Sequence, residues 1–268
     1  MRLCLLLLFI DLVIGLYDPR QVETEVVLPE LRFLYQGKRI SPWHDIPFLA
    51  VGNDETSLLS FVCEIPLGTR QKMEIHKSLK MNPMVQDKFK DGSPRYYKYS
   101  PSIVNYGAIP QTWENPDFLD PDTGLGGDND PIDVLQLNEK SCERGAVQRV
   151  RVLGALALID DGETDWKLLV VDVDDSSNAT TWKQLSDIPT ERIDQVTDWF
   201  RVYKMIEGKP MNKYAFNDKP VDAQHALRVA KQTHEHWQAL IQGKASCTFK
   251  KEACWVQREV PLIESDEL

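Results

Sequence analysis

Short apolar runs, separated by polar, glycine-rich or proline-rich stretches, fill the first two thirds of the chain. Runs of this kind, rich in Val, Ile, Leu and Phe, are typical of β-strands. We predict strands at residues 31–35, 59–65, 72–76, 132–137, 146–159 and 166–173. A loop bracketed by Pro42 and Pro47 is expected to lead into this region, because proline interrupts regular structure.

The last third of the chain has a different period. Its apolar residues recur every three or four positions, which predicts two amphipathic helices. The first is marked by Ile193, Val196, Trp199, Phe200 and Tyr203, and the second by Ala223, Ala226, Leu227, Ala230, Trp237, Leu240 and Ile241. Strands followed by helices predict an α+β domain, and so many short strands favour a barrel.

The two ends of the chain look like sorting signals. Residues 1–15 have a basic start, a short apolar run and a final Gly15, which is typical of a secretory signal peptide. The run is too short to span a membrane and Asp11 interrupts it, so the alternative is an N-terminal arm. Residues 265–268, Ser-Asp-Glu-Leu, resemble the Lys-Asp-Glu-Leu retention signal. We therefore expect the lumen of the endoplasmic reticulum or the secretory pathway, with the cytoplasm as the alternative.

Composition narrows the range of partners. The 268 residues include 41 acidic and 31 basic side chains, which gives a formal charge of −10, and 42% are hydrophobic. A chain this rich in hydrophobic residues folds. Its acidic balance disfavours phosphate backbones and anionic membranes, so we expect no nucleic-acid partner and no stable membrane span.

The five cysteines fit neither a disulfide scaffold nor a zinc site, because no Cys-x-x-Cys pair occurs. Cys63 lies in an apolar run and is predicted to be a core residue, whereas Cys142 lies in a polar stretch and suggests no role. Cys247 and Cys254 are seven residues apart, and they either pair in an oxidising lumen or remain free thiols. Residues 178–180 form a glycosylation sequon that only a secreted chain uses.

The first concentration of carboxylates lies where a glycine loop enters an apolar strand. Asp128, Asp130 and Asp133 fall within six residues, and Asp133 is framed by Ile132 and Val134. At about 4 Å and an effective dielectric near 20, two like charges repel by roughly 4 kcal/mol. A solvated loop explains Asp128, but Asp133 lies inside the strand. A partly buried acid cluster of this kind needs cations.

The second concentration lies at a predicted hairpin turn. Asp161-Gly162 between two apolar runs is a hairpin signal. If residues 161–164 form the loop, Asp160 and Asp165 face each other across the two strands, where like charges destabilise the pair. Lys167 is two residues beyond Asp165 and therefore on the same face. An exposed pair of Asp165 and Lys167 is the alternative.

Oxygen ligands in both clusters favour a hard divalent cation, since His and Cys are scarce nearby. An EF-hand calcium loop fails on spacing. Counting from Asp128 puts Ile132 at position 5 and Asp133 where the loop needs glycine, and counting from Asp172 puts Lys183 at position 12.

An ordered series of motifs then resembles the soluble inorganic pyrophosphatases of family I, of the eukaryotic type. The heptad 128–134, Asp-Asn-Asp-Pro-Ile-Asp-Val, resembles the signature of that family. The other motifs, in the same order as in the family, are Ser-Pro-Trp-His-Asp-Ile-Pro (41–47), Glu-Ile-Pro (64–66), Lys-Met-Glu-Ile (72–75), Asn-Tyr-Gly-Ala (105–108), Pro-Gln-Thr-Trp (110–113), the segment 160–167 and Trp-Phe-Arg-Val-Tyr-Lys (199–204). The resemblance covers about residues 31–244, so we place the enzyme domain at 16–244 and a tail at 245–268.

The resemblance implies a fold, a reaction and a set of site residues. The fold is an OB-like five-stranded β-barrel core with flanking helices, and the reaction is Mg²⁺-dependent hydrolysis of pyrophosphate to two orthophosphates, with Mn²⁺ as a substitute metal. The implied metal ligands are Asp128, Asp133, Asp165, Asp160 and Glu74. The implied phosphate-binding residues are Lys72, Arg95, Lys167, Tyr203 and Lys204. Asp130 is the implied general base, and Glu64 and Tyr106 are implied to support the metal ligands or the water network.

Three features depart from the family pattern. Ser102 stands where the family usually has a tyrosine that has been proposed as a proton donor, and the stretch from Arg95 to Asn105 is shorter than usual. Leu67-Gly68 stands where eukaryotic members carry Arg-Trp, a segment linked to dimer contacts, so a homodimer is a weaker expectation. The competing hypothesis is a catalytically weakened phosphate- or metal-binding protein, and Ser102 is the main argument for it.

Overall fold

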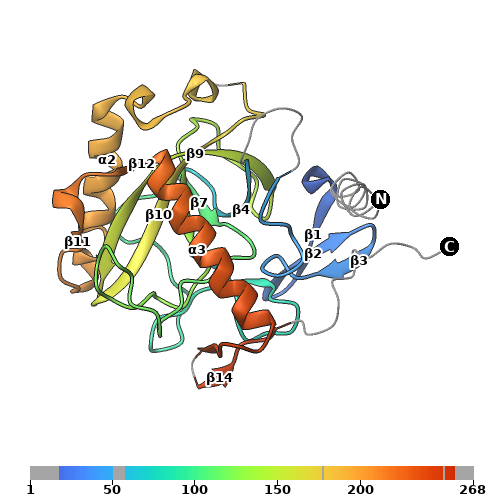
Figure 1. The fold of residues 1–268 in the computed structure, drawn as a ribbon. Helices are drawn as coiled ribbons and strands as arrows, with labels where there is room; N and C mark the ends of the chain where they lie inside the picture. The colour runs from blue at the N-terminus through green and yellow to red at the C-terminus, as the bar shows by residue number, and fades with distance from the viewer. Residues whose placement is uncertain (1–17, 51–57, 177, 250, 257–268) are drawn as a thin grey trace, which may run out of the picture.

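Figure 1 shows the computed structural model, which describes residues 18–256 apart from 51–57, 177 and 250. The predicted signal peptide and the retention-like tail lie outside the described residues. Within them, the strands form a seven-stranded sheet, a five-stranded sheet and a two-stranded hairpin. No described helix is long and apolar enough to cross a membrane.

Five strands of the larger sheet pair in a closed ring. They are β4 (Leu59–Ile65), β7 (Asn105–Ala108), β8 (Asp133–Gln136), β9 (Val147–Asp160) and β10 (Glu163–Asp172). They follow the order β4-β7-β8-β10-β9, and β9 pairs again with β4. The pairing of β8 with β10 is parallel, and the other pairings of the ring are antiparallel. Two short strands, β11 (Lys213–Tyr214) and β12 (Val221–Asp222), pair with β9.

The smaller sheet packs beside the ring. It contains β1 (Val22–Val27), β2 (Glu30–Tyr35), β3 (Lys38–Ile40), β5 (Met73–Ile75) and β6 (Met84–Gln86). The order is β1-β2-β6-β5, with β3 also paired to β2. The last pair, β13 (Thr248–Phe249) with β14 (Glu252–Ala253), forms a separate hairpin. It lies beyond the predicted domain boundary at 244, yet Cys247 and Cys254 belong to the core beneath the smaller sheet.

Both predicted helices are present. The strands of the ring contribute to two clusters of buried apolar residues. Helix α2 (Thr190–Val202) adds Val196, Trp199 and Phe200 to one cluster, and α3 (Ala223–Ile241) adds Ala226 and Ala230 to the other. In Figure 1, α3 crosses the ring diagonally and α2 lies to one side of it. The short 3-10 helices are η1 (Pro19–Gln21), η2 (Asn178–Thr181), η3 (Leu185–Asp187), η4 (Met205–Glu207) and η5 (Phe216–Asp218).

All six predicted strands have a counterpart in the structure, but eight other described strands were missed, namely β1, β3, β6, β11, β12, β13, β14 and the short ring strand β7. Its residues, Asn-Tyr-Gly-Ala, lack the apolar alternation of a strand, so only the neighbouring strands β4 and β8 define it. Gly107 permits this pairing, because a Cβ there would collide with the carbonyl oxygen of Val62.

Two disulfides cross-link the described residues. Cys63 is buried, as predicted, and it pairs with Cys142, 79 residues away, so that β4 is joined to the loop after β8. Cys247 pairs with Cys254 and closes the hairpin of β13 and β14. The first pair was not predicted, because the fold alone brings its two cysteines together.

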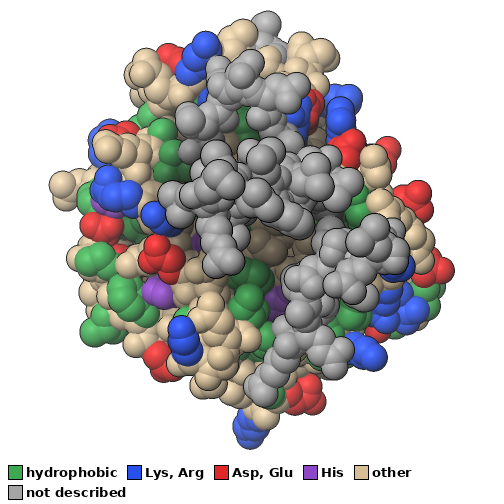
Figure 2. Space-filling model, turned by 45° about the vertical axis from the view of Figure 1, so that its right-hand side comes forward, with side chains coloured by type: hydrophobic (Ala, Val, Ile, Leu, Met, Phe, Trp, Pro, Cys, Tyr) green, Lys and Arg blue, Asp and Glu red, His purple; other side chains and the backbone are tan. Residues whose placement is uncertain are grey.

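The face shown in Figure 2 carries acidic and basic side chains next to one another around its edge.

Candidate active site

A polar hollow of about 290 Å³ lies where β5, β7, β8 and β10 meet. Ten acidic and four basic side chains line it, so its local charge is strongly negative. The hollow brings together all thirteen predicted site residues: Glu64, Lys72, Glu74, Arg95, Tyr106, Asp128, Asp130, Asp133, Asp160, Asp165, Lys167, Tyr203 and Lys204. An acidic surplus of this size suits a site in which cations are bound before an anionic substrate.

The loop before β8 presents its aspartates through a tight turn. Asn129 has the left-handed backbone conformation, with φ at 72°. The Asp128 carboxylate accepts a hydrogen bond from the backbone N–H of Asp130 at 2.9 Å. The backbone of Glu114 ties the loop down, since Glu114 accepts from Asn129 at 2.9 Å and donates to Asp130 at 2.8 Å. Asp128 and Asp130 therefore occupy fixed positions at the edge of the hollow.

The hairpin of β9 and β10 is tighter than predicted. Its loop contains only Asp161 and Gly162, both with positive φ, which is the two-residue turn that Asp-Gly favours. As a result Asp160 lies opposite Glu163 and Asp165 lies opposite Leu158, so the predicted direct pairing of Asp160 with Asp165 is wrong. The shift is an even number of residues, so both aspartates still face the hollow.

Lys167 lies on the same face as Asp165, as predicted, but the pair is not exposed. The Lys167 side chain is only 2% exposed, and its ammonium donates to Asp165 at 2.9 Å and to Asp133 at 2.6 Å. Parallel pairing of β8 with β10 sets Asp133 beside Lys167 and makes this bridge possible. The Tyr106 hydroxyl donates to the same Asp133 carboxylate.

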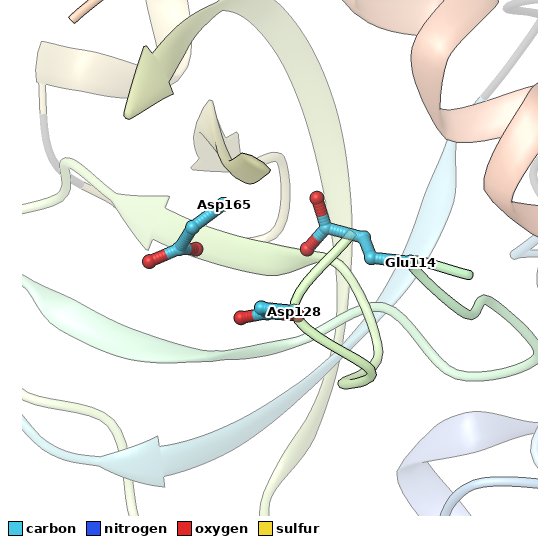
Figure 3. Close-up of side chains that lie close together, drawn as sticks. All are labelled: Glu114, Asp128 and Asp165. Atoms are coloured by element: carbon cyan, nitrogen blue, oxygen red, sulfur yellow. The ribbon is translucent and has the colours of Figure 1, made fainter. Parts of the chain in front are cut away.

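Three carboxylates lie close together at the hollow, and two of them, Asp128 and Asp165, line it (Figure 3). Each of Glu114, Asp128 and Asp165 contributes one oxygen, and these oxygens lie within 4.8 Å of one another. One oxygen of Glu114 accepts from the backbone N–H of Trp166 at 2.9 Å. The other, Oε2, is buried without a hydrogen-bond partner. Buried polar atoms are rarely left unsatisfied, so this donor set fits a hard divalent cation.

Burial raises the pKa of these acids. Desolvation, followed by repulsion from neighbouring carboxylates, puts the pKa values of Glu114 and Asp128 well above their ordinary range. Desolvation also raises the pKa of Asp165 to about 7, although the nearby Lys167 opposes the shift. Glu64 is 4% exposed, and burial raises its pKa as well, while its carboxylate accepts from the backbone N–H of Ile75 at 2.8 Å. A bound cation would favour the charged form of such groups.

The remaining basic residues of the hollow are each paired with an acid. The Lys72 ammonium lies 2.8 Å from Glu74, and the Arg95 guanidinium lies 3.0 Å from Asp87. Lys204 forms an ion pair with Asp160. Each pair places a cation on the wall of the hollow, where it can exchange a carboxylate for a phosphate oxygen.

Sequence reasoning missed Glu114, Lys77 and Phe249. Glu114 directly follows the motif at 110–113, and Lys77 is two residues beyond the motif at 72–75, so both positions are near recognised segments. Lys77 is 5% exposed at its side chain and forms an ion pair with Asp130. Phe249, far along the chain, lines the hollow, and no sequence pattern connected it with the acidic loop.

Ser102 lies outside the lining of the hollow. It is buried, and its hydroxyl donates to the backbone carbonyl of Val104 at 2.7 Å. This side chain therefore supports the turn before β7 and is directed to the backbone.

Comparisons with known proteins agree with these observations. A sequence model of the family described as inorganic pyrophosphatase matches residues 61–238. The inorganic pyrophosphatase of Mus musculus is 44% identical over 216 residues, covering 78% of this chain and 73% of that protein. The corresponding protein of Eremothecium gossypii is 41% identical over 238 residues, covering 86% of this chain and 82% of its own.

Solved structures give the same result. A truncated vacuolar soluble pyrophosphatase of Trypanosoma cruzi in complex with PPi superposes with a TM-score of 0.75 at 36% identity, covering 82% of this chain and 90% of that one. The type I inorganic pyrophosphatase of Toxoplasma gondii gives a TM-score of 0.75 at 35% identity, covering 81% and 97% of the two chains.

Proposed function

The chain belongs to the type I soluble inorganic pyrophosphatases, and from this membership we propose that it hydrolyses pyrophosphate to two orthophosphates with Mg²⁺ as the metal. The observation that carries the proposal is the hollow in which ten acidic and four basic side chains meet. A site for an anionic substrate needs such a carboxylate surplus only if divalent cations neutralise it. Mn²⁺, which prefers similar oxygen ligands, is the expected substitute.

Asp128, Asp133, Asp165 and Asp160 are the residues that we propose as metal ligands, and Glu74 is proposed to act through water. The convergence of Glu114 on Asp128 and Asp165 supports adding this residue to the set. Bound divalent cations supply charge neutralisation and lower the pKa of a coordinated water. All the proposed donors are oxygens, which suits Mg²⁺ and Mn²⁺ and disfavours zinc.

The basic residues are proposed to bind and orient the substrate. Arg95 suits a two-point contact with a phosphate group, whereas Lys72, Lys167 and Lys204 act as point charges. In this structure each cation already touches a carboxylate of the hollow. Tyr203 lines the same wall and can donate its hydroxyl to a phosphate oxygen.

Asp130 is the proposed proton acceptor. Its side chain is 45% exposed and lies outside the group formed by Glu114, Asp128 and Asp165. A carboxylate that is free of the metal can take the proton of the attacking water at its Oδ atom. Lys77, held against Asp130, fixes the direction of that carboxylate. Glu64 accepts a hydrogen bond from the backbone of Ile75, and Tyr106 donates one to Asp133. Both residues are proposed to support the metal ligands or the water network.

Release of orthophosphate from pyrophosphate, measured with Mg²⁺ and again with EDTA, tests the proposal. We expect rapid release with Mg²⁺ and almost none with EDTA. Absence of metal-dependent release would favour a binding protein that has kept the fold, the alternative for which Ser102 argues. The closed ring of five strands supports the further proposal that the core is an OB-like barrel.

We also propose that the chain works in the lumen of the secretory pathway. The two disulfides support this, because structural disulfides form and persist in oxidising compartments. The test is expression of an internally tagged chain, followed by endoglycosidase treatment. A mobility shift that Asn178→Gln abolishes is expected, and a cytosolic chain without a glycan would refute the proposal.

A further inference from the structure

The hairpin of β13 and β14 lies against the acidic loop of the candidate active site. Its ends are joined by the disulfide of Cys247 with Cys254 and by a hydrogen bond from the Cys254 N–H to the Cys247 carbonyl at 3.0 Å. The family match ends at residue 238, so this hairpin lies beyond the matched residues.

The hairpin holds the acidic loop through Asn129, the residue between Asp128 and Asp130. The Asn129 side-chain amide donates to the backbone carbonyl of Thr248 at 3.1 Å. Its oxygen accepts from the indole N–H of Trp113 at 3.0 Å. The side chain at the tip of the acidic loop is thus fixed from the core on one side and from the hairpin on the other.

The same segment holds Lys77, the partner of Asp130. The Lys77 ammonium lies 4.4 Å from the centre of the Phe249 ring, over its face. The backbone carbonyl of Lys77 accepts from the Trp255 N–H at 2.8 Å. The Phe249 ring also forms a T-shaped contact with the ring of His76, with 5.3 Å between the ring centroids.

These contacts leave the Lys77 ammonium between an aromatic face and a carboxylate. A cation over an aromatic face is attracted to it, and the attraction grows as water is excluded. Lys77 is 5% exposed at its side chain, so water is largely excluded here. Phe249 also lines the hollow that contains Asp130. The ring therefore limits the positions that Lys77 can take and, through it, those of the Asp130 carboxylate.

We propose that the disulfide-closed hairpin is a working part of the active site, in which Phe249 is a positioning residue that holds Lys77 against Asp130. The inference rests on the proposed function, since Asp130 is the proton acceptor of that reaction. Phe249 affects the catalytic step because it acts on the proton acceptor through Lys77.

Steady-state hydrolysis of pyrophosphate by three variants of the full chain tests the proposal. Phe249→Leu keeps an apolar side chain and removes the ring, and we expect kcat to fall about fivefold while KM stays within about twofold of wild type. Phe249→Tyr restores a ring and should recover most of the lost kcat. Phe216→Leu is the matched control, because Phe216 is 39% exposed and lies outside the hollow.

The disulfide is tested by the double variant Cys247→Ser with Cys254→Ser. We expect a fall in kcat similar to that of Phe249→Leu, because an open hairpin no longer holds the ring in place. The triple variant adds Phe249→Leu to these two changes. Its kcat should match that of Phe249→Leu alone within about twofold, because opening the disulfide and removing the ring disrupt the same interaction. Thermal unfolding of every variant checks that the fold is intact.

The outcomes separate this inference from the proposed function. Wild-type kcat in Phe249→Leu, an equal loss in Phe216→Leu, or failure of Phe249→Tyr to recover activity would overturn the role of Phe249 alone. A triple variant whose loss is the product of the two separate losses would overturn the link between disulfide and ring. A wild-type chain without metal-dependent phosphate release would overturn the proposed function and this inference together.

Discussion

Replacement of Asp165 by asparagine is expected to stabilise the metal-free protein and to destabilise the Mg²⁺-bound protein relative to wild type. Asp165 is 6% exposed and close to Glu114 and Asp128. Asparagine has nearly the same shape, removes the charge and keeps an oxygen that can accept from Lys167. The variant therefore separates the cost of burying the Asp165 charge from the proposed role of Asp165 as a metal ligand.

The magnitude follows from the pKa of Asp165. Folding raises it from the ordinary 3.8 to about 7, and this gap corresponds to about 4 kcal/mol. The pKa of Asp165 is higher in the folded state than in the unfolded state, so ionisation of this carboxyl opposes folding. The resulting loss of stability grows as the pH rises from 3.8 to about 7 and is complete above pH 7. The attraction between the Asp165 carboxylate and Lys167 is already part of this pKa, and Lys167 keeps Asp133 at 2.6 Å in the variant. The expected gain in the free energy of unfolding above pH 7 is thus about 4 kcal/mol, or roughly 8–16 °C in melting temperature.

Thermal unfolding followed by circular dichroism at pH 5 and pH 8, in EDTA and in Mg²⁺, is the assay. In EDTA the melting temperature of Asp165→Asn should exceed that of wild type only slightly at pH 5 and by the full expected amount at pH 8. In Mg²⁺ the order of stability should reverse, because a ligand that binds the folded state stabilises it and the variant lacks one of the proposed metal ligands. Asp198→Asn is the control, since Asp198 is 74% exposed and its pair with Arg201 contributes little. A variant that is less stable than wild type in EDTA at pH 8 would refute the reasoning.

Three further predictions concern the site and the fold. Asp130→Asn should lower kcat at least about 100-fold while Mg²⁺ affinity, measured by calorimetry, stays within about twofold; near-normal phosphate release would exclude Asp130 as the base. Glu114→Gln should raise the Mg²⁺ concentration for half-maximal activity about tenfold, and an unchanged metal titration would remove Glu114 from the metal site. Cys63→Ala with Cys142→Ala opens a loop of 79 residues and should cost about 4 kcal/mol in denaturant unfolding; an unaltered midpoint would contradict a stabilising disulfide.

Alternation of side chains along strands explains why the sequence predicted so much of the site. Asp165 and Lys167 share a face because a strand has a period of two, and this holds whatever the strand packs against. The same period kept Asp160 and Asp165 on one face even though the turn proved tighter than predicted. The helices were found for a similar reason, because Val196, Trp199 and Phe200 form a stripe at helical spacing.

Tertiary structure decided the contacts between segments that are distant in the chain. No period relates Glu114 to Asp165, Cys63 to Cys142, or Phe249 to Lys77, so only the strand order and the path of the C-terminal segment bring these residues together. Burial was decided in the same way, since Lys167 lies between two acids and is 2% exposed because β8 pairs with β10. The sequence by itself therefore determined the family, six of the strands, both long helices and most of the acids that line the hollow. The fold determined which charged side chains are buried, that Asp133 and Asp165 both contact Lys167, and that the Phe249 ring lies over Lys77. These contacts join residues that are far apart in the sequence, so local periodicity does not predict them.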